Sequence, residues 1–158
     1  MAQTDLLLRL AALNGEYVRC IDADRLEAWP DFFHERCLYK LTSAENHRRG
    51  YAVGVIYADS RAMLRDRVAA LREANIFERQ AYRHLVGMPT IGACRDGRTE
   101  VETPFLVTRI MRDGRMDLFA TGVYLDQVLP DDAGRLRFAE RVVVCDSSRF
   151  DTLVAIPL

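Results

Sequence analysis

Hydrophobic residues recur at helical spacing in the first quarter of the chain. Five of them share one face of a helix that we predict to begin with a cap at Thr4: Leu6, Leu10, Leu13, Tyr17 and Ile21. Glu16 and Arg19 fall on the opposite face. The pattern is that of an amphipathic helix that covers a flat surface.

Two further helices are predicted in the first half of the chain. A short one runs over 24–28, after which Pro30 favours an extended or turn geometry at Trp29. Asp59-Ser60 offers a cap for a helix over 60–74. The apolar residues of this helix form one stripe: Met63, Leu64, Val68 and Leu71.

From about residue 81 the apolar period changes to two, which predicts strands. Four segments carry this pattern: 81–88, 100–111, 118–124 and 136–144. Asp113-Gly114 is a hairpin signal, and 130–134 is a second turn. Helices followed by antiparallel strands predict an α+β domain in which a curved sheet wraps around the helices. Pro104 and Gly122 interrupt two strands and predict bulges, edges or bends there.

Length and composition narrow the class of protein. The chain has 158 residues, enough for one domain that buries roughly 70% of the surface of its unfolded form, so we expect a single domain over 1–158. A net charge of -1 gives no field that would attract nucleic acid or anionic lipid. Without a signal peptide or membrane span, the expected location is the cytoplasm, where the four scattered cysteines would be free, buried thiols.

The motifs of cofactor enzymes are missing from the sequence. A Rieske cluster needs Cys-x-His and Cys-x-x-His segments, and no cysteine here has a histidine within two residues. A mononuclear iron needs two histidines and a carboxylate on one face, whereas His34, His47 and His84 are far apart in sequence. We therefore expect no metal and no cofactor in this chain. Cys145-Asp146-Ser147-Ser148 is more typical of a turn than of a nucleophile.

Of the three histidines, His84 is the main candidate for a catalytic group. It follows Arg83 on a predicted strand, so one of the two faces inward and the other outward. It is either a general acid or base with Asp22, Tyr39 or Asp59 as an orienting partner, or a buried polar residue without a catalytic role. The sequence also leaves two environments open for Asp66-Arg67: the two charges are either solvated or form a buried ion pair.

A series of short motifs in a fixed order resembles one family. Its elements are Trp29, Phe32 and Phe33; Met63, Leu64, Asp66 and Arg67; Arg83-His84; Gly122, Tyr124 and Asp126; Asp146-Ser147; and the apolar terminus that ends at Leu158. The set resembles the small (beta) subunit of aromatic-ring-hydroxylating dioxygenases, and the detail around 45–47, 58–60 and 71–76 is most similar to terephthalate-type dioxygenases. The match spans nearly the whole chain.

The resemblance implies a fold and a set of partners. The fold is a cone of curved antiparallel sheet around helices, like nuclear transport factor and cystatin. The partner is a large (alpha) subunit that carries the Rieske [2Fe-2S] cluster and the mononuclear Fe(II), with electrons from NADH through a reductase. Three small subunits form a homotrimer that supports three large ones in a hetero-hexamer. The residues of the motif series are then candidates for interface or structural roles.

Two other functions stay open at this point. One is a stand-alone dehydratase or isomerase of the same cone fold that uses His84 as general acid or base. The other is a module that binds a small ligand without chemistry. The aromatic substrate cannot be identified from this chain, because the resemblance places the substrate pocket on the large subunit.

Overall fold

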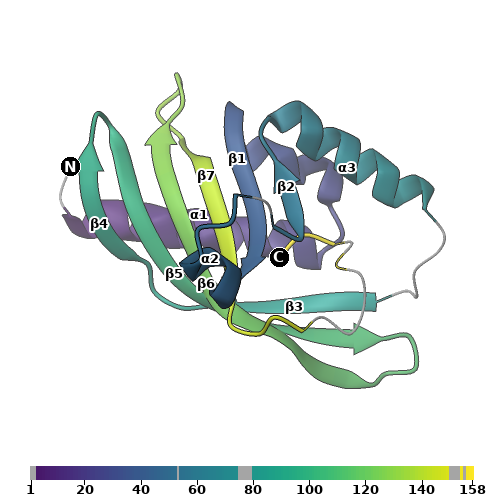
Figure 1. The fold of residues 1–158 in the computed structure, drawn as a ribbon. Helices are drawn as coiled ribbons and strands as arrows, with labels where there is room; N and C mark the ends of the chain where they lie inside the picture. Colours follow the sequence, from purple (N-terminus) through teal and green to yellow (C-terminus); the bar gives the residue numbers. More distant parts are fainter. Residues whose placement is uncertain (1–2, 53, 75–79, 150–153, 155) are drawn as a thin grey trace.

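The computed structural model of the chain describes residues 3–52, 54–74, 80–149, 154 and 156–158. The elements follow one another in this order: α1 (Gln3–Asp22), η1 (Leu26–Phe32), β1 (Phe33–Ser43), α2 (Ala44–Arg48), β2 (Ile56–Ala58), α3 (Arg61–Glu73), β3 (Gln80–Val86), β4 (Thr90–Arg95), β5 (Arg98–Met111), β6 (Met116–Pro130) and β7 (Leu136–Cys145). Figure 1 shows α1 running behind a strongly curved sheet, with the short α2 in front of it. The expected α+β class is confirmed.

The strands form one mixed sheet in the order β2-β1-β7-β6-β5-β3, with β4 also paired to β5. Every pairing is antiparallel except that of β1 with β7, which is parallel. The expectation of a purely antiparallel sheet is therefore wrong at one junction. A parallel neighbour needs a long connection, and here residues 44–135 lie between β1 and β7.

The two long helices agree closely with the sequence pattern. Helix α1 buries Leu10, Leu13, Tyr17 and Ile21, as predicted, but Thr4 lies inside the helix instead of capping it. Helix α3 is capped by Ser60, whose hydroxyl accepts a hydrogen bond from the Met63 amide at 3.3 Å. Its buried stripe is narrower than predicted, because Met63 is 40% exposed.

The segment around Pro30 differs from the prediction. Residues 26–32 form a 3-10 helix that includes both Trp29 and Pro30, where we expected a helix over 24–28 and an extended or turn geometry. The fixed backbone angle of proline is compatible with a 3-10 turn, and Trp29 is fully buried there. Tertiary burial therefore determines this segment.

Strand β5 accommodates Pro104 and strand β6 accommodates Gly122 for different structural reasons. Pro104 lies between the part of β5 that pairs with β3 and the part that pairs with β4, so its missing N–H faces a gap between two edge strands. Gly122 lies where β6 approaches β7 so closely that a Cβ would lie 2.0 Å from the Val144 carbonyl oxygen. The edge expected at Pro104 and the special backbone expected at Gly122 are both present.

Strands β1, β2 and β4 and helix α2 were not predicted. Strand β1 has no clean alternation, since Leu41, Thr42 and Ser43 are all buried. Strand β4 is a short and largely exposed edge. The expected burial of all cysteines is wrong for Cys94, which is exposed, while Cys20, Cys37 and Cys145 are buried free thiols.

Candidate functional site

An ion pair lies at the centre of the cone. Arg141 on β7 and Asp126 on β6 are direct cross-strand partners. Nε of Arg141 donates to Oδ1 of Asp126 at 2.8 Å, and Nη2 donates to Oδ2 at 2.7 Å. Both side chains have no exposed surface. This bidentate geometry is the strongest form of an arginine–carboxylate contact.

Aromatic rings enclose the Arg141 guanidinium. Its carbon lies 3.8 Å from the ring centre of Phe138, 4.0 Å from that of Tyr124 and 4.2 Å from that of Tyr17. Burial alone would lower the pKa of Arg141, but the Asp126 carboxylate raises that pKa above its ordinary value. Arg141 and Asp126 are therefore both ionised, and their opposite charges cancel. The three aromatic rings stabilise the guanidinium cation.

Helix α1 contributes a polar bridge to this pair. Nη2 of Arg141 also donates to Oδ1 of Asn14, and Nδ2 of Asn14 donates to the Thr103 hydroxyl at 3.1 Å. All four polar side chains are buried. The network joins α1 to β5, β6 and β7 across the inside of the cone.

The C-terminal residue occupies the same interior. The hydroxyls of Tyr17 and Tyr39 both donate to the Leu158 carbonyl oxygen, at 2.9 and 3.1 Å. The Leu158 amide lies 3.2 Å from the Tyr39 oxygen, and Arg67 donates to the Val154 carbonyl oxygen at 3.1 Å. Burial raises the pKa of Tyr39 well above its ordinary value, so this hydroxyl stays protonated. Among the described residues, these side chains and Leu158 thus fill the interior around Tyr17 and Tyr39.

His84 faces inward, and Arg83 is exposed. Nδ1 of His84 lies 2.6 Å from Oδ1 of Asp22, and the His84 amide donates to Oδ2 at 2.9 Å. The Asp22 carboxylate at the end of α1 therefore contacts both the backbone amide and the imidazole ring of His84 on β3. A cavity of about 300 Å³ lies beside the pair. Nε2 of His84 is buried without a hydrogen-bond partner among the described residues.

The other two residues of the proposed dehydratase or isomerase site lie elsewhere. Tyr39 binds the C-terminal residue, and Asp59 is exposed after β2. The structure therefore brings together His84 and Asp22 but not Tyr39 or Asp59.

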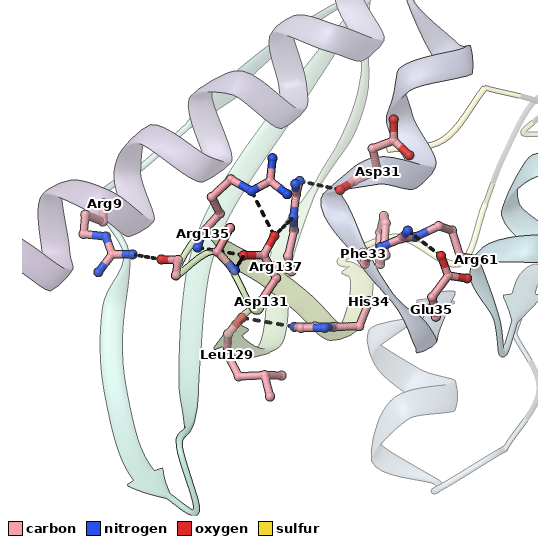
Figure 2. Close-up of polar contacts among 12 residues, drawn as sticks. Arg9, Asp31, Phe33, His34, Glu35, Arg61, Leu129, Asp131, Arg135 and Arg137 are labelled. Atoms are coloured by element: carbon pink, nitrogen blue, oxygen red, sulfur yellow. Dashed lines mark hydrogen bonds and ion pairs between the residues drawn. The ribbon is translucent and has the colours of Figure 1, made fainter.

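A second polar cluster joins the turn between β6 and β7 to η1 and α1. Figure 2 shows Arg135 and Arg137 converging on Asp131, with N–O distances of 2.9 and 3.2 Å. Arg137 also donates to the Asp31 carbonyl oxygen, and Arg9 donates to that of Gly134 at 2.7 Å. These contacts attach the sheet to the helical layer at its outer end.

His34 and Arg61 stabilise the nearby start of β1. Nε2 of His34 lies 3.1 Å from the Leu129 carbonyl oxygen, as Figure 2 shows. Nε of Arg61 donates to the Phe33 carbonyl oxygen at 3.0 Å, and its Nη1 lies 2.6 Å from the Glu35 carboxylate.

The remaining motif residues fall into two groups. The following lie in the interior of the chain: Trp29, Phe33, Tyr124, Asp126, His84 and Leu158. The following reach the surface wholly or in part: Phe32, Asp66, Arg67, Arg83 and Asp146. Asp146 accepts from the Thr121 hydroxyl at 2.8 Å, and Ser147 accepts from the Arg149 amide at 3.1 Å, as in a turn. The family motifs 71–76 and 153–158 extend into residues outside the described part of the chain.

The residues present do not fit an iron centre. His34 and His84 are engaged with Leu129 and Asp22, and His47 is exposed on α2. Among the described residues, no group of three His, Cys, Asp or Glu side chains could hold a metal ion. Within the same part of the chain, no helix is both long and apolar enough to cross a membrane.

Residues 17–152 match the sequence profile of the family described as "Ring hydroxylating beta subunit". The chain belongs to this family. Beta subunit 1 of the terminal oxygenase component of terephthalate 1,2-dioxygenase from Comamonas sp is 47% identical, covering 96% of this chain and 97% of that protein. The small subunit of anthranilate 1,2-dioxygenase from Burkholderia cepacia is 38% identical, covering 92% of this chain and 90% of that protein.

A solved structure agrees with this assignment. The beta subunit of a putative aromatic-ring-hydroxylating dioxygenase from Novosphingobium aromaticivorans DSM 12444 is 34% identical, covers 98% of both chains and has a TM-score of 0.89. More distant solved structures share the same nuclear transport factor-like fold. This beta subunit is therefore one component of a ring-hydroxylating dioxygenase, an oxidoreductase, and its partner is an alpha subunit.

Four residues of the interior network of the beta subunit escaped sequence reasoning: Tyr17 in its hydrogen-bonding role, Asn14, Thr103 and Arg141. Arg141 had a usable signal, since it directly precedes Val142, Val143 and Val144 on an otherwise apolar strand. A charged residue at an inward position needs a partner, and Asp126 is inward on the neighbouring strand.

Proposed function

We propose that this beta subunit is the non-catalytic scaffold of an oxygenase that dihydroxylates an aromatic carboxylate, with terephthalate as the first candidate. The alpha subunit carries the Rieske cluster and the mononuclear iron, and a reductase passes electrons from NADH. Three beta subunits support three alpha subunits in this assembly. The names of the terephthalate and anthranilate relatives favour a carboxylate substrate.

The observation that carries the scaffold role is the filled interior. Within the described residues, Tyr17, Tyr39 and Leu158 pack into the interior with no exposed surface, so their hydroxyl and backbone groups are committed to one another and not to a ligand. The charged groups of the interior are committed to one another, as in the Arg141–Asp126 pair. A core of this kind supports a rigid body that presents surfaces to partners.

Co-expression tests this proposal. The tagged beta subunit is produced with its alpha subunit, and the purified complex is supplied with reductase, NADH and a panel of benzoate, anthranilate, phthalate and terephthalate. The proposal predicts co-purification and a dihydrodiol product from terephthalate. A beta subunit that purifies alone from such cells would refute the scaffold role, and a complex that converts only uncharged arenes would refute the carboxylate assignment.

A stand-alone dehydratase or isomerase is the second candidate, and the 2.6 Å contact between His84 and Asp22 favours it. An imidazole held by a carboxylate is the arrangement of a general base. Against it, the free Nε2 is shielded from solvent, so no substrate proton reaches it in this conformation. The scaffold role accounts for the same contact as a link between α1 and β3.

A further inference from the structure

A cavity of about 300 Å³ lies between the C-terminal half of α1 and strand β3. Five of its lining residues come from one face of α1, where positions three and four apart lie side by side: Gly15, Val18, Arg19, Asp22 and Ala23. Arg83 and His84 of β3 complete the lining. We call this space the α1–β3 cavity. Its volume is at the lower end of the range of about 300–1,000 Å³ for pockets that bind small molecules.

The charged residues around this cavity favour an anion. The Asp22 carboxylate is already held by the ring and the amide of His84, at 2.6 and 2.9 Å. Arg19 and Arg83 are exposed, and neither has an ion-pair partner among the described residues. Two guanidinium groups against one carboxylate leave the lining with a net positive charge, even when His84 is neutral. Guanidinium groups bind carboxylates in a planar and often bidentate geometry.

Gly15 leaves the helix surface open on the side of the cavity. An ideal Cβ at this position would meet no atom within 4 Å, and the backbone there does not have a positive φ. Neither a close approach nor a turn therefore requires glycine. Since glycine inside a helix is less stable than alanine, the fold alone does not explain this residue. Its missing side chain leaves room for a flat group beside Val18 and Arg19, which lie one helical turn further along.

We propose that the α1–β3 cavity binds an aromatic carboxylate with a single ring, whose carboxylate group pairs with Arg19 and Arg83. The ring lies over Gly15 and against Val18, which is buried. Guanidinium groups also stack on aromatic faces, which favours an aromatic acid over an aliphatic one. The site belongs to the beta subunit itself, so it goes beyond the proposed function, in which this subunit binds no small molecule.

Calorimetric titration of benzoate into the purified beta subunit tests the site. Benzamide has the same shape without the charge, and inorganic phosphate has charge without the ring. The variants R19Q and R83Q each remove one guanidinium group from an exposed side chain, and Gly15→Leu fills the space over the helix. The matched control is R48Q, which removes the same charge from an exposed position of α2, on the other side of the sheet (Figure 1). Thermal unfolding checks the fold of every variant and of Gly15→Ala.

Benzoate is expected to bind the wild type and R48Q with equal affinity. Its affinity falls by at least about tenfold in R19Q and in R83Q, because each variant loses a charge-assisted contact with the carboxylate. Benzamide and phosphate bind the wild type at least about tenfold more weakly than benzoate, since each lacks one of the two recognised features. Gly15→Leu abolishes binding. Gly15→Ala raises the melting temperature of the free subunit, because alanine is the better helix former.

Four results would overturn the proposal. They are a wild type that binds no benzoate up to about 10 mM, affinities that are the same in the site variants and the control, phosphate binding as tight as that of benzoate, and a lower melting temperature in Gly15→Ala. A beta subunit that binds benzoate in the expected way but does not co-purify with an alpha subunit would refute the proposed function and leave the binding site standing.

Discussion

The Tyr39 hydroxyl lies 3.1 Å from the carbonyl oxygen of Leu158 and 3.2 Å from its amide nitrogen. One side chain of β1 thus binds both polar backbone groups of a residue that is more than a hundred positions away in sequence. Both residues are fully buried. The contact holds Leu158 against the core of the cone.

Removing this hydroxyl is expected to destabilise the protein. In Tyr39→Phe, the Leu158 amide loses its acceptor and the carbonyl oxygen keeps only Tyr17, so the free energy of unfolding falls by about 1–3 kcal/mol. Urea denaturation monitored by circular dichroism measures the change. Tyr57→Phe removes the same atom from a side chain that is 44% exposed and serves as control. Equal stabilities of the two variants would contradict the role of the contact.

The Arg141–Asp126 pair is expected to show strong coupling. Asp126→Ala leaves a buried guanidinium unpaired and lowers the free energy of unfolding by about 3–5 kcal/mol. Replacing both residues, as in Asp126→Leu with Arg141→Met, removes both charges and costs less than the single change. Chemical denaturation of the two single variants and the double variant gives the coupling. Additive effects would show that the two charges do not depend on each other.

Protonation of Asp131 is expected to make the stability of the folded protein depend on pH in the acid range. Desolvation alone would raise the pKa of Asp131, but hydrogen bonds from the Arg135 and Ala133 amides and from the Arg135 and Arg137 side chains lower that pKa to about 2. Because the folded pKa lies below the unfolded value of about 3.9, the stabilisation is present above pH 4 and is lost as the pH falls toward 2.

The matching variant for this acid dependence is Asp131→Asn. It should flatten the fall of the melting temperature between pH 4 and pH 2, whereas Asp132→Asn at the next, exposed position should not. Calorimetry in glycine and acetate buffers measures both. An unchanged slope in the Asp131 variant would contradict the assignment.

Two variants of His84 test whether its contact with Asp22 has a structural role, as a link between α1 and β3. His84→Asn places an amide N–H near the position of Nδ1 and retains the contact with Asp22, whereas His84→Ala removes the donor. We expect a loss of stability of about 1–3 kcal/mol for His84→Ala and a smaller one for His84→Asn. Hydrogen exchange of the β3 amides reports whether the edge strand opens. Equal protection of β3 in the two variants would contradict the linking role.

The sequence predicts local elements of this fold well. The five apolar residues of α1 and the Asp113-Gly114 turn specify their structures through neighbours in the chain, because helical period and turn geometry are local properties. The same reasoning left the choice between Arg83 and His84 open, since alternation shows that two residues face apart but not which face is covered. The inward position of His84 is set by Asp22 on a distant helix.

Non-local features could not be predicted in the same way. The parallel pairing of β1 with β7 joins two strands that residues 44–135 separate in sequence. Strand β1 does not alternate at its end, since Leu41, Thr42 and Ser43 are all buried. The cross-strand register of Asp126 with Arg141 depends on the bulge between Gln127 and Val128, which no local pattern reveals. The periods predicted a curved sheet around helices, and the family resemblance added its likeness to nuclear transport factor.

The most direct test of the scaffold role is the turnover of an assembled complex that contains the His84→Asn beta subunit. Product formation from terephthalate is measured with reductase and NADH at equal iron content, together with the mass of the complex. The account predicts the same kcat as for the wild-type complex. A fall in kcat of at least about 100-fold in a fully assembled complex, the size expected for the loss of a general acid or base, would contradict it.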